Sequence, residues 1–398
     1  MSDQTFDTEN VSAKGKTHLI LPAARDGSQT ENSVATKLAE KFAASDNVSI
    51  SLNRDAFNKA TRFGYAIETD YKQPVKLRIG ILNSMLSRAA TDVMLTQRII
   101  ESVEWAREHD RLNGDVAIEI VPISPRQLEH GLTEEAKDTD LAYVDNFHHT
   151  LDSASFDDLN LDTLVVTGTV PREDHLHKEV FWPDMKEAID FVKDSKTPAL
   201  FSCLAAQAYL QDVYDIPREK RDSKLFGHFK QNILTPHHPL LKDIPQDDGP
   251  DLYLPGSRFW QSNEDVLQQA VADNQRLKVI TESADMGASI MTDRTEQRNV
   301  ALWTLHPEYN KNTLANEYNR DAKLGLNPDK PENCDIDNAE NNAVYFEYQL
   351  PLLFNALAPV LTAKAMQDRT AQDAANQNDA YTAHQTSAPI AAFASPSL

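Results

Sequence analysis

Short, almost continuous runs of Val, Ile and Leu alternate with longer amphipathic stretches through the middle of this chain. Such apolar runs are typical of parallel strands that are covered on both faces. They occupy residues 76–83, 116–123, 162–169, 198–204, 277–283, 289–293 and 300–306. Helical stretches follow or separate them at 88–110, 182–195, 205–215 and 310–325. This order predicts an α/β fold with an open, doubly wound, mostly parallel sheet, whose reacting groups gather beyond the carboxyl ends of the strands.

The predicted α/β domain spans residues 71–364, and polar segments flank it on both sides. Residues 1–70 are rich in polar and acidic side chains and predict a largely disordered or extended segment. A short helix is predicted inside it, because Val34, Leu38 and Phe42 repeat at four-residue spacing. Residues 365–398 are rich in Ala, Gln, Asn and Ser and predict a flexible tail.

Composition narrows the range of partners. The chain carries 39 Lys and Arg against 61 Asp and Glu, a formal net charge of −22, so we expect no binding to nucleic acid or anionic membrane. No apolar run is long enough to span a bilayer, and the polar N-terminus is unlike a secretory leader. Two cysteines, Cys203 and Cys334, are too few for a disulfide framework, which favours a reducing cytoplasm.

Cys203 lies where an apolar run meets a helical one. In Pro198-Ala-Leu-Phe-Ser-Cys203-Leu-Ala-Ala-Gln-Ala, a strand leads straight into the cysteine and small residues follow it. A helix N-terminus favours the thiolate and lowers the pKa of a thiol placed there. Its free N–H groups also stabilise the oxyanion that forms when a thiolate attacks a carbonyl. Cys203 is therefore a candidate nucleophile, and a buried inert cysteine is the alternative.

A cysteine nucleophile needs a base, and the base needs a group that orients it. The segment Val300-Ala-Leu-Trp-Thr-Leu-His306-Pro-Glu308-Tyr309 supplies both at the end of another apolar run. Because residues i and i+2 of an extended chain point to the same side, Glu308 can lie alongside His306 and fix its tautomer. The remaining histidine pairs lack a second cluster at metal spacing, so we expect no metal site; they are His148-His149, His175/His177 and His237-His238.

The chain resembles the homoserine O-acyltransferases, which include O-succinyl and O-acetyl transferases and have a flavodoxin-like, class I glutamine-amidotransferase-like fold. The resemblance runs from about Val75 to Leu361. The matching stretches are Arg78-Ile-Gly-Ile-Leu-Asn83, Thr167-Gly168, Glu179-Val-Phe-Trp182, Cys203-Leu-Ala-Ala-Gln207-Ala, Lys224-Leu-Phe-Gly227, Pro255-Gly-Ser257-Arg258, His306-Pro-Glu308-Tyr309, Thr313-Leu, Glu317-Tyr-Asn-Arg320-Asp321 and Gly325-Leu-Asn-Pro328. The resemblance implies a homodimer with no cofactor, in which acyl-CoA is a co-substrate and a hydroxy amino acid such as homoserine is the acceptor.

The resemblance also implies residue roles. Cys203 is the acyl-accepting nucleophile, His306 the general base and Glu308 its orienter. The backbone N–H of Leu204 belongs to the oxyanion hole. Lys224, Ser257 and Arg320 fall on substrate-binding positions. The chemistry of Arg320 agrees, because a guanidinium clamps a carboxylate with two parallel hydrogen bonds; a surface arginine paired with Glu317 or Asp321 is the alternative.

Arg172 bears on the choice of acyl group. It lies five residues beyond Thr167, at a position that influences acyl choice in the family. A guanidinium can pair with the distal carboxylate of a succinyl group, which favours succinyl-CoA over acetyl-CoA; pairing with Glu173 or Asp174 is the alternative. The basic run Arg218, Lys220 and Arg221 is a candidate receptor for CoA phosphates or, equally, a solvated loop.

The chain departs from the family pattern around the pocket. Leu204 replaces Trp, Gly256 replaces His and Leu305 replaces Gly, while the catalytic trio is kept. These changes predict a divergent member whose acceptor is homoserine, serine or a relative. Two other functions stay open: a glutaminase or thioester hydrolase, which uses the same fold and trio, and a non-catalytic binding protein.

Overall fold

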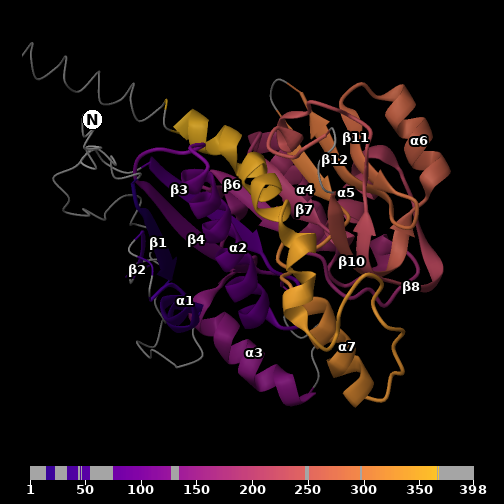
Figure 1. The fold of residues 1–398 in the computed structure, drawn as a ribbon, viewed down its shortest axis with the longest axis horizontal. Coiled ribbons are helices and arrows are strands. Elements are labelled where there is room, and N and C mark those ends of the chain that lie inside the picture. Colours follow the sequence, from indigo (N-terminus) through magenta and orange to yellow (C-terminus); the bar gives the residue numbers. More distant parts are fainter. Residues whose placement is uncertain are drawn as a thin grey trace, which may run out of the picture.

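A single large sheet forms the centre of the protein (Figure 1). The computed structural model describes residues 15–22, 34–43, 45, 47–53, 75–126, 134–246, 251–295, 298–364 and 366. Neighbouring strands of the 11-stranded sheet follow the order β2-β1-β4-β3-β6-β7-β13-β12-β11-β9, with β5 beside β4. Their bounds are β1 Thr17–Pro22, β2 Val48–Asn53, β3 Val75–Leu82, β4 Val116–Ser124, β5 His149–Thr150, β6 Thr163–Val166, β7 Ala199–Ser202, β9 Asn232–Ile233, β11 Leu277–Ser283, β12 Gly287–Arg294 and β13 Asn299–Trp303.

Most of this sheet is parallel, as predicted. Every pairing from β2 across to β13 is parallel, whereas β12, β11 and β9 are joined in antiparallel pairs. Two long strands, β8 (Arg218–Lys230) and β10 (Tyr253–Ser262), form a separate antiparallel pair. The predicted apolar runs all fall on strands, but the runs 162–169, 198–204 and 300–306 extend two or three residues beyond the ends of β6, β7 and β13.

Helices cover both faces of the sheet, so it is doubly wound. On one side lie α1, α2 and a C-terminal helix over residues 349–364, drawn in yellow beside α2 in Figure 1. On the other side lie α4, α5 and α6. The bounds are α1 Val34–Phe42, α2 Arg88–Glu108, α3 Glu134–Phe147, α4 Trp182–Ser195, α5 Leu204–Tyr214, α6 Glu264–Asp273 and α7 Thr313–Lys323; short 3₁₀ turns cover Phe156–Leu159, Leu176–Lys178, Pro239–Leu241 and Ala339–Phe346.

The alternation of side chains along each strand feeds two apolar cores. On β6, Val165 packs into the core beneath α2, while Leu164 and Val166 pack into the core beneath α4 and α5. Successive strand side chains point to opposite faces, so a strand that is buried on both faces must be apolar at every position. This burial on both faces explains why the apolar runs of the sequence are almost continuous.

Part of the N-terminal segment belongs to the sheet. The helix predicted from Val34, Leu38 and Phe42 is confirmed as α1, and Leu38 is fully buried. Strands β1 and β2, which the sequence did not suggest, extend the sheet beyond β4 in parallel register. The predictions for residues 1–14, 23–33, 54–74 and 367–398 lie outside the described residues.

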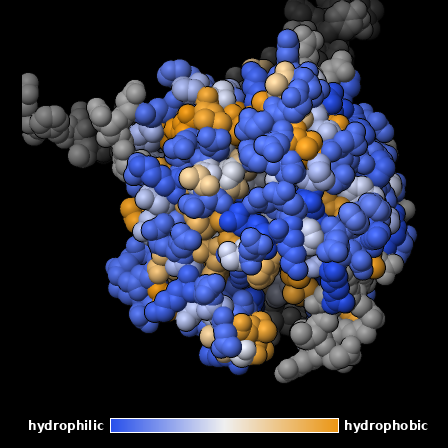
Figure 2. Space-filling view, turned by 90° about the vertical axis from the view of Figure 1, so that its right-hand side faces the viewer, coloured by the Kyte–Doolittle hydropathy of each residue, from blue (hydrophilic) through white to orange (hydrophobic). Residues whose placement is uncertain are grey.

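Hydrophilic residues occupy most of the face shown in Figure 2, with smaller apolar patches among them. Within the part of the chain that the structure describes, no helix combines the length and apolar character needed to cross a membrane.

Candidate active site

Cys203 occupies the sharp turn between β7 and α5. The strand ends at Ser202 and the helix begins at Leu204, so the cysteine stands at the helix N-terminus, as the sequence predicted. Its backbone has φ +50° and ψ −117°, a conformation that costs energy for any residue other than glycine. Its N–H donates to the carbonyl of Trp303 at 2.7 Å, which holds the turn against the neighbouring strand β13. The turn therefore fixes the thiol at the carboxyl edge of the sheet.

His306 and Glu308 approach the same edge from β13. This strand pairs in parallel with β7, and Trp303 lies opposite Ser202, so the two chains leave the sheet side by side. His306 Nδ1 is 2.8 Å from Glu308 Oε1, which commits that nitrogen to the carboxylate. Nε2 has no other hydrogen-bond partner of ordinary geometry among the described side chains and is left for the thiol. The Tyr309 ring stacks on the imidazole with centroids 4.3 Å apart.

The electrostatics favour an ion pair between Cys203 and His306. Burial alone would raise the pKa of the thiol, but the charge of His306 and a hydrogen bond to it, with a smaller effect of Arg258, bring that pKa below its ordinary value. Burial opposes the charged form of His306 too, yet the charges of Cys203 and Glu308 raise its pKa well above the ordinary value. Each partner thus stabilises the charged form of the other. Both side chains are almost fully buried, which strengthens their attraction.

Gly168 keeps the approach to the nucleophile open. It lies just beyond β6, the strand on the other side of β7. A Cβ placed on Gly168 would lie 3.1 Å from both the Cβ of Cys203 and the backbone nitrogen of Leu204. Leu204 is the first residue of α5, where N–H groups have no partner within the helix. The N–H predicted for the oxyanion hole is therefore uncovered because residue 168 has no side chain.

Lys224 and Ser257 gather around one carboxylate that the sequence analysis had not assigned a role. Glu317 Oε1 accepts hydrogen bonds from Lys224 Nζ and Ser257 Oγ, each at 2.7 Å. Its Oε2 accepts one from the Tyr309 hydroxyl at 3.0 Å. Burial would raise the pKa of Glu317, but Lys224 and these hydrogen bonds lower it below its usual range. Through Tyr309 this anionic cluster is linked to the imidazole of His306. Glu317 lies three residues before Arg320 on the same helix. This spacing, which places the two side chains on one face, was the sequence signal that could have added Glu317 to the site.

The side chains of Arg320 and Arg172 are more exposed than those of Lys224 and Ser257. Arg320 is 63% exposed at its side chain and pairs with Asp321 at 2.6 Å, which is the alternative that the sequence analysis left open. Arg172 is exposed, and its backbone N–H, rather than its guanidinium, donates to Glu179 at 3.0 Å. Within the described ranges the Arg172 guanidinium forms no ion pair, so the pairing suggested with Glu173 or Asp174 is absent.

The basic run at the start of β8 is partly structural. Arg218 is 9% exposed and pairs with the buried carboxylate of Glu179 at 3.0 Å, beneath the Trp260 ring. Arg221 donates to the side chain of Gln261 and to the carbonyl of Asp285. The prediction of a free cationic patch is thus wrong for Arg218, because a salt bridge needs its guanidinium in the interior.

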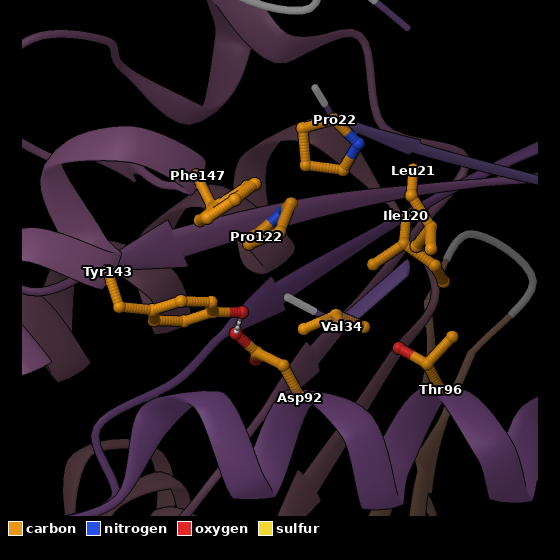
Figure 3. Close-up of a pocket in the computed structure, with 9 residues that line it drawn as sticks. All are labelled: Leu21, Pro22, Val34, Asp92, Thr96, Ile120, Pro122, Tyr143 and Phe147. Carbon is orange, nitrogen blue, oxygen red and sulfur yellow. Dashed lines mark hydrogen bonds between the residues drawn. The ribbon is translucent and has the colours of Figure 1, made fainter. Parts of the chain in front are cut away.

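A second His–carboxylate pair lies deeper in the protein. His148 Nε2 is 2.8 Å from Asp92 Oδ2, and its Nδ1 is 2.8 Å from Ser124 Oγ, an arrangement with the composition of a hydrolase triad. All three residues are at most 1% exposed. Figure 3 shows Asp92 bonded to Tyr143 beside a cavity of about 10 Å³, which is roughly the room for one water. Because His148 is fully buried and both of its ring nitrogens have partners, we assign it a structural role.

Three of the remaining histidines lie at the surface or make local contacts. His175 and His177 are exposed and stack on each other, while His238 is buried and accepts from the Leu240 N–H. Among the residues that the structure describes, no group of three His, Cys, Asp or Glu side chains is arranged to hold a metal. Cys334 is half-buried, and burial raises the pKa of its thiol, so it lacks the environment of a reactive cysteine.

The fold is a doubly wound, mostly parallel α/β sheet, and its carboxyl edge holds a cysteine at a strand–helix turn beside a His–Glu pair. Solved structures of similar fold include a glutamine amidotransferase from Thermotoga maritima, 11% identical with TM-score 0.43, which covers 72% of this chain and 98% of that one. Another is a glutamine amidotransferase from Methylobacillus flagellatus, 9% identical with TM-score 0.38, which covers 74% of this chain and 96% of that one.

The family follows from the sequence match. Residues 66–357 match the homoserine O-succinyltransferase family, and the chain belongs to it. A "Probable acyltransferase" of Sodalis glossinidius (strain morsitans) is 33% identical over 214 residues, covering 53% of this chain and 65% of the relative, slightly less than two thirds of its length. This membership agrees with the resemblance found in the sequence.

Proposed function

We propose that the protein moves an acyl group, succinyl in preference to acetyl, from acyl-CoA through an acyl-cysteine at Cys203 to the hydroxyl of homoserine or a related amino acid. The observation that carries this proposal is the geometry at the carboxyl edge of the sheet. A strained, buried cysteine at a helix N-terminus faces a histidine whose other nitrogen is held by Glu308. This is the arrangement that nucleophilic acyl transfer requires.

In the first half-reaction, His306 holds the proton of the Cys203 thiol as an imidazolium, and the thiolate attacks the thioester carbonyl carbon. The negative charge that develops on the carbonyl oxygen faces the N–H of Leu204 at the start of α5. The bond between that carbon and the CoA sulfur then breaks. CoA leaves as a thiol with the proton from His306, and the acyl group remains as a thioester on Cys203.

In the second half-reaction, the acceptor hydroxyl gives its proton to Nε2 of His306 and its oxygen attacks the acyl-cysteine. The bond to sulfur breaks, the ester leaves, and the thiolate–imidazolium pair is restored. Cys203 is only 8% exposed, which limits the access of water to the intermediate. Tight burial therefore favours transfer to the acceptor over hydrolysis.

The cluster beyond Tyr309 has the charges that an amino-acid acceptor needs. Glu317 is an anion that attracts an ammonium group, and the exposed guanidinium of Arg320 lies 3.9 Å from its carboxylate. A carboxylate and a guanidinium held together complement the two charges of an amino acid. Lys224 and Ser257 hold Glu317 in place, which explains why those positions matter for the acceptor in this proposal.

Intact-mass spectrometry of the protein mixed with acyl-CoA alone tests the proposal. We expect a mass increase of one acyl group, mapped to Cys203 by peptide digestion, and no such increase in Cys203→Ala. Addition of homoserine or serine should release the group as an ester. Absence of the adduct with every acyl-CoA tried, or release of ammonia from glutamine instead, would contradict the proposed reaction.

A further inference from the structure

Tyr309 contacts the proposed base with its ring and the carboxylate of Glu317 with its hydroxyl. The ring stacks on the His306 imidazole, with centroids 4.3 Å apart and planes 16° from parallel. The hydroxyl donates to Glu317 Oε2 at 3.0 Å. Since Glu317 belongs to α7, this one side chain reaches from the loop beyond β13 to the helix that follows it. Tyr309 therefore touches both the base and the carboxylate proposed to attract the acceptor.

A tight turn holds the Tyr309 ring over the imidazole. The Tyr309 N–H donates to the His306 carbonyl at 3.3 Å, which closes a β-turn with Pro307 at its second position. Proline is favoured there because its ring sets the φ angle in advance. The tyrosine is 6% exposed and packs in a small apolar cluster whose other buried members are Phe226, Leu314 and Phe346. Because the turn fixes the backbone and the cluster fixes the ring, the imidazole stacked on it has little freedom to rotate.

The hydrogen bond from Tyr309 to Glu317 joins a neutral donor to an anion. Burial, with a further effect of the charge of Glu317, raises the pKa of Tyr309 well above its usual value, so the phenol keeps its proton. Burial opposes ionisation of Glu317 too, but the charge of Lys224, with a smaller effect of His306, helps to keep its pKa below the usual range. A hydrogen bond to an ionised acceptor is stronger than one between neutral groups, so this link is a firm one.

Glu317 retains room for one more donor. A carboxylate accepts about four hydrogen bonds, two at each oxygen. Oε1 accepts from Lys224 and Ser257, whereas among the described residues Oε2 accepts from Tyr309 alone. The position left open is therefore on Oε2, the oxygen beside the tyrosine hydroxyl. An acceptor ammonium bound to Glu317 at that position lies next to the ring that stacks on the base.

We infer that Tyr309 is a positioning residue, which holds Glu317, the anchor of the acceptor, at a fixed distance and angle from His306. The inference rests on the proposed function and deepens it, because it names the group that aligns the acceptor with the base. Transfer requires the acceptor oxygen within hydrogen-bond distance of Nε2, so anchor and base must keep one geometry in the second half-reaction. The first half-reaction involves no acceptor and needs the ring of Tyr309 but not its hydroxyl. The alternative is a tyrosine that contributes packing only.

Tyr309→Phe tests the inference, because phenylalanine keeps the stacking ring and loses the hydroxyl. Intact-mass spectrometry times two steps separately: acylation of Cys203 by succinyl-CoA alone, and release of the acyl group to homoserine or serine, whichever releases it from the wild type. We expect acylation within about twofold of wild type and release at saturating acceptor slowed about tenfold, the effect of one lost charge-assisted hydrogen bond. The acceptor concentration for half-maximal release should change less, because Lys224 and Ser257 still hold Glu317.

Two further variants complete the test. Tyr309→Leu removes the ring as well and should slow both steps. Tyr253→Phe is the matched control: it makes the same change in a tyrosine of β10 that packs edge-on against Tyr345, and it should leave both rates unchanged. Because both steps are timed on one sample, a loss of folded protein affects them alike.

Three results would overturn the inference while acylation itself stands. They are equal slowing of the two steps in Tyr309→Phe, release in Tyr309→Phe at the wild-type rate, and acylation in Tyr309→Leu at the wild-type rate. Failure of the wild-type protein to form an adduct would instead overturn the proposed function.

Discussion

Among the described residues are two buried His–carboxylate pairs, His306 with Glu308 and His148 with Asp92, and the first of them adjoins the candidate nucleophile Cys203. His306 with Glu308 and His148 with Asp92 have the same 2.8 Å separation, and each has a nucleophilic side chain nearby. Ser124 ends β4 and continues regular strand geometry, whereas Cys203 sits at positive φ on a turn into a helix. Ser124 is fully buried, and its hydrogen bond to His148 is part of a closed network.

This contrast teaches that a triad of the right composition does not make a catalytic site. The imidazole of His148 is satisfied at both nitrogens, and Asp92 accepts from Asn83, Tyr143 and His148. At His306 one nitrogen is left for the thiol, and a free helix N-terminus stands beside that thiol. The unsatisfied donors, rather than the pair itself, are what a reaction can use.

The largest expected difference between the two pairs is in activity. His306→Gln should reduce acyl-cysteine formation by about 10²- to 10⁴-fold, the usual contribution of a general base. Ser124→Ala should retain most of the activity, because nothing reaches Ser124. Stopped-time mass spectrometry of the adduct measures both. A Ser124→Ala protein that folds normally but has lost acylation would reverse the assignment.

For the free energy of unfolding, we expect the larger loss at the His148–Asp92 pair and the smaller loss at the His306–Glu308 pair. Asp92→Ala leaves three buried donors without an acceptor, which should lower the free energy of unfolding by about 3 kcal/mol or more. Glu308→Ala removes the acceptor of the hydrogen bond from His306 and should cost less, because fewer donors lose their partner. Urea unfolding followed by circular dichroism compares them. Equal losses would show that the two networks contribute alike to folding.

Gly168 provides a finer test of access to the nucleophile. Gly168→Ala places a methyl group 3.1 Å from the Leu204 nitrogen and should slow acylation about tenfold or more by crowding one oxyanion donor. The matched control is Gly256→Ala, whose added methyl group meets Leu225 and Met286 rather than the Leu204 nitrogen. Gly114→Ala cannot serve as a control, because the φ of Gly114 is +90° and an alanine there would strain the backbone. Equal rates in wild type and Gly168→Ala would remove this site from the reaction.

The pH dependence of acylation should give the smallest effect. Since the pKa of Cys203 is lowered and that of His306 is raised, the ion pair exists between the two values. The rate should fall on the acid side as the thiolate takes a proton and on the alkaline side as the imidazolium loses one. Glu308→Gln removes a charge that raises the pKa of His306, so the alkaline limb should move to lower pH. A limb that stays in place would exclude this electrostatic role of Glu308.

Sequence reasoning was most successful where local patterns fix the geometry. Apolar runs that end at Cys203 and His306 placed both residues at the carboxyl edge, and the structure brings these two strands together as neighbours. The i, i+2 spacing also predicted the contact between His306 and Glu308. These features depend on strand periodicity and on short-range spacing, which a single sequence carries.

Long-range pairing explains what the sequence did not predict. The burial of Arg258 depends on the register between β8 and β10 and on a turn 28 residues away that supplies the Met286 carbonyl. The partners of Asp92 come from two distant parts of the chain, Asn83 just after β3, and Tyr143 and His148 at the end of α3 and just beyond it. Likewise, the antiparallel direction of β12 and β11 is set by the short turn between them, which the apolar runs themselves do not encode.

Strands β1 and β2 lie outside the range that matches the family, yet β1 pairs with Val116–Glu119 of β4, and β2 pairs with β1. A protein trimmed to residues 66–357 would retain β4 and β3 but lose β1, the neighbour of β4 on its other side. The backbone donors and acceptors on that side of β4 would then form an open edge, which readily joins a strand of another molecule. In the full chain β1 covers this side of β4 and moves the edge of the described sheet to β2. A shortened protein ends the sheet at β4 instead, a longer strand that leaves more backbone groups without partners.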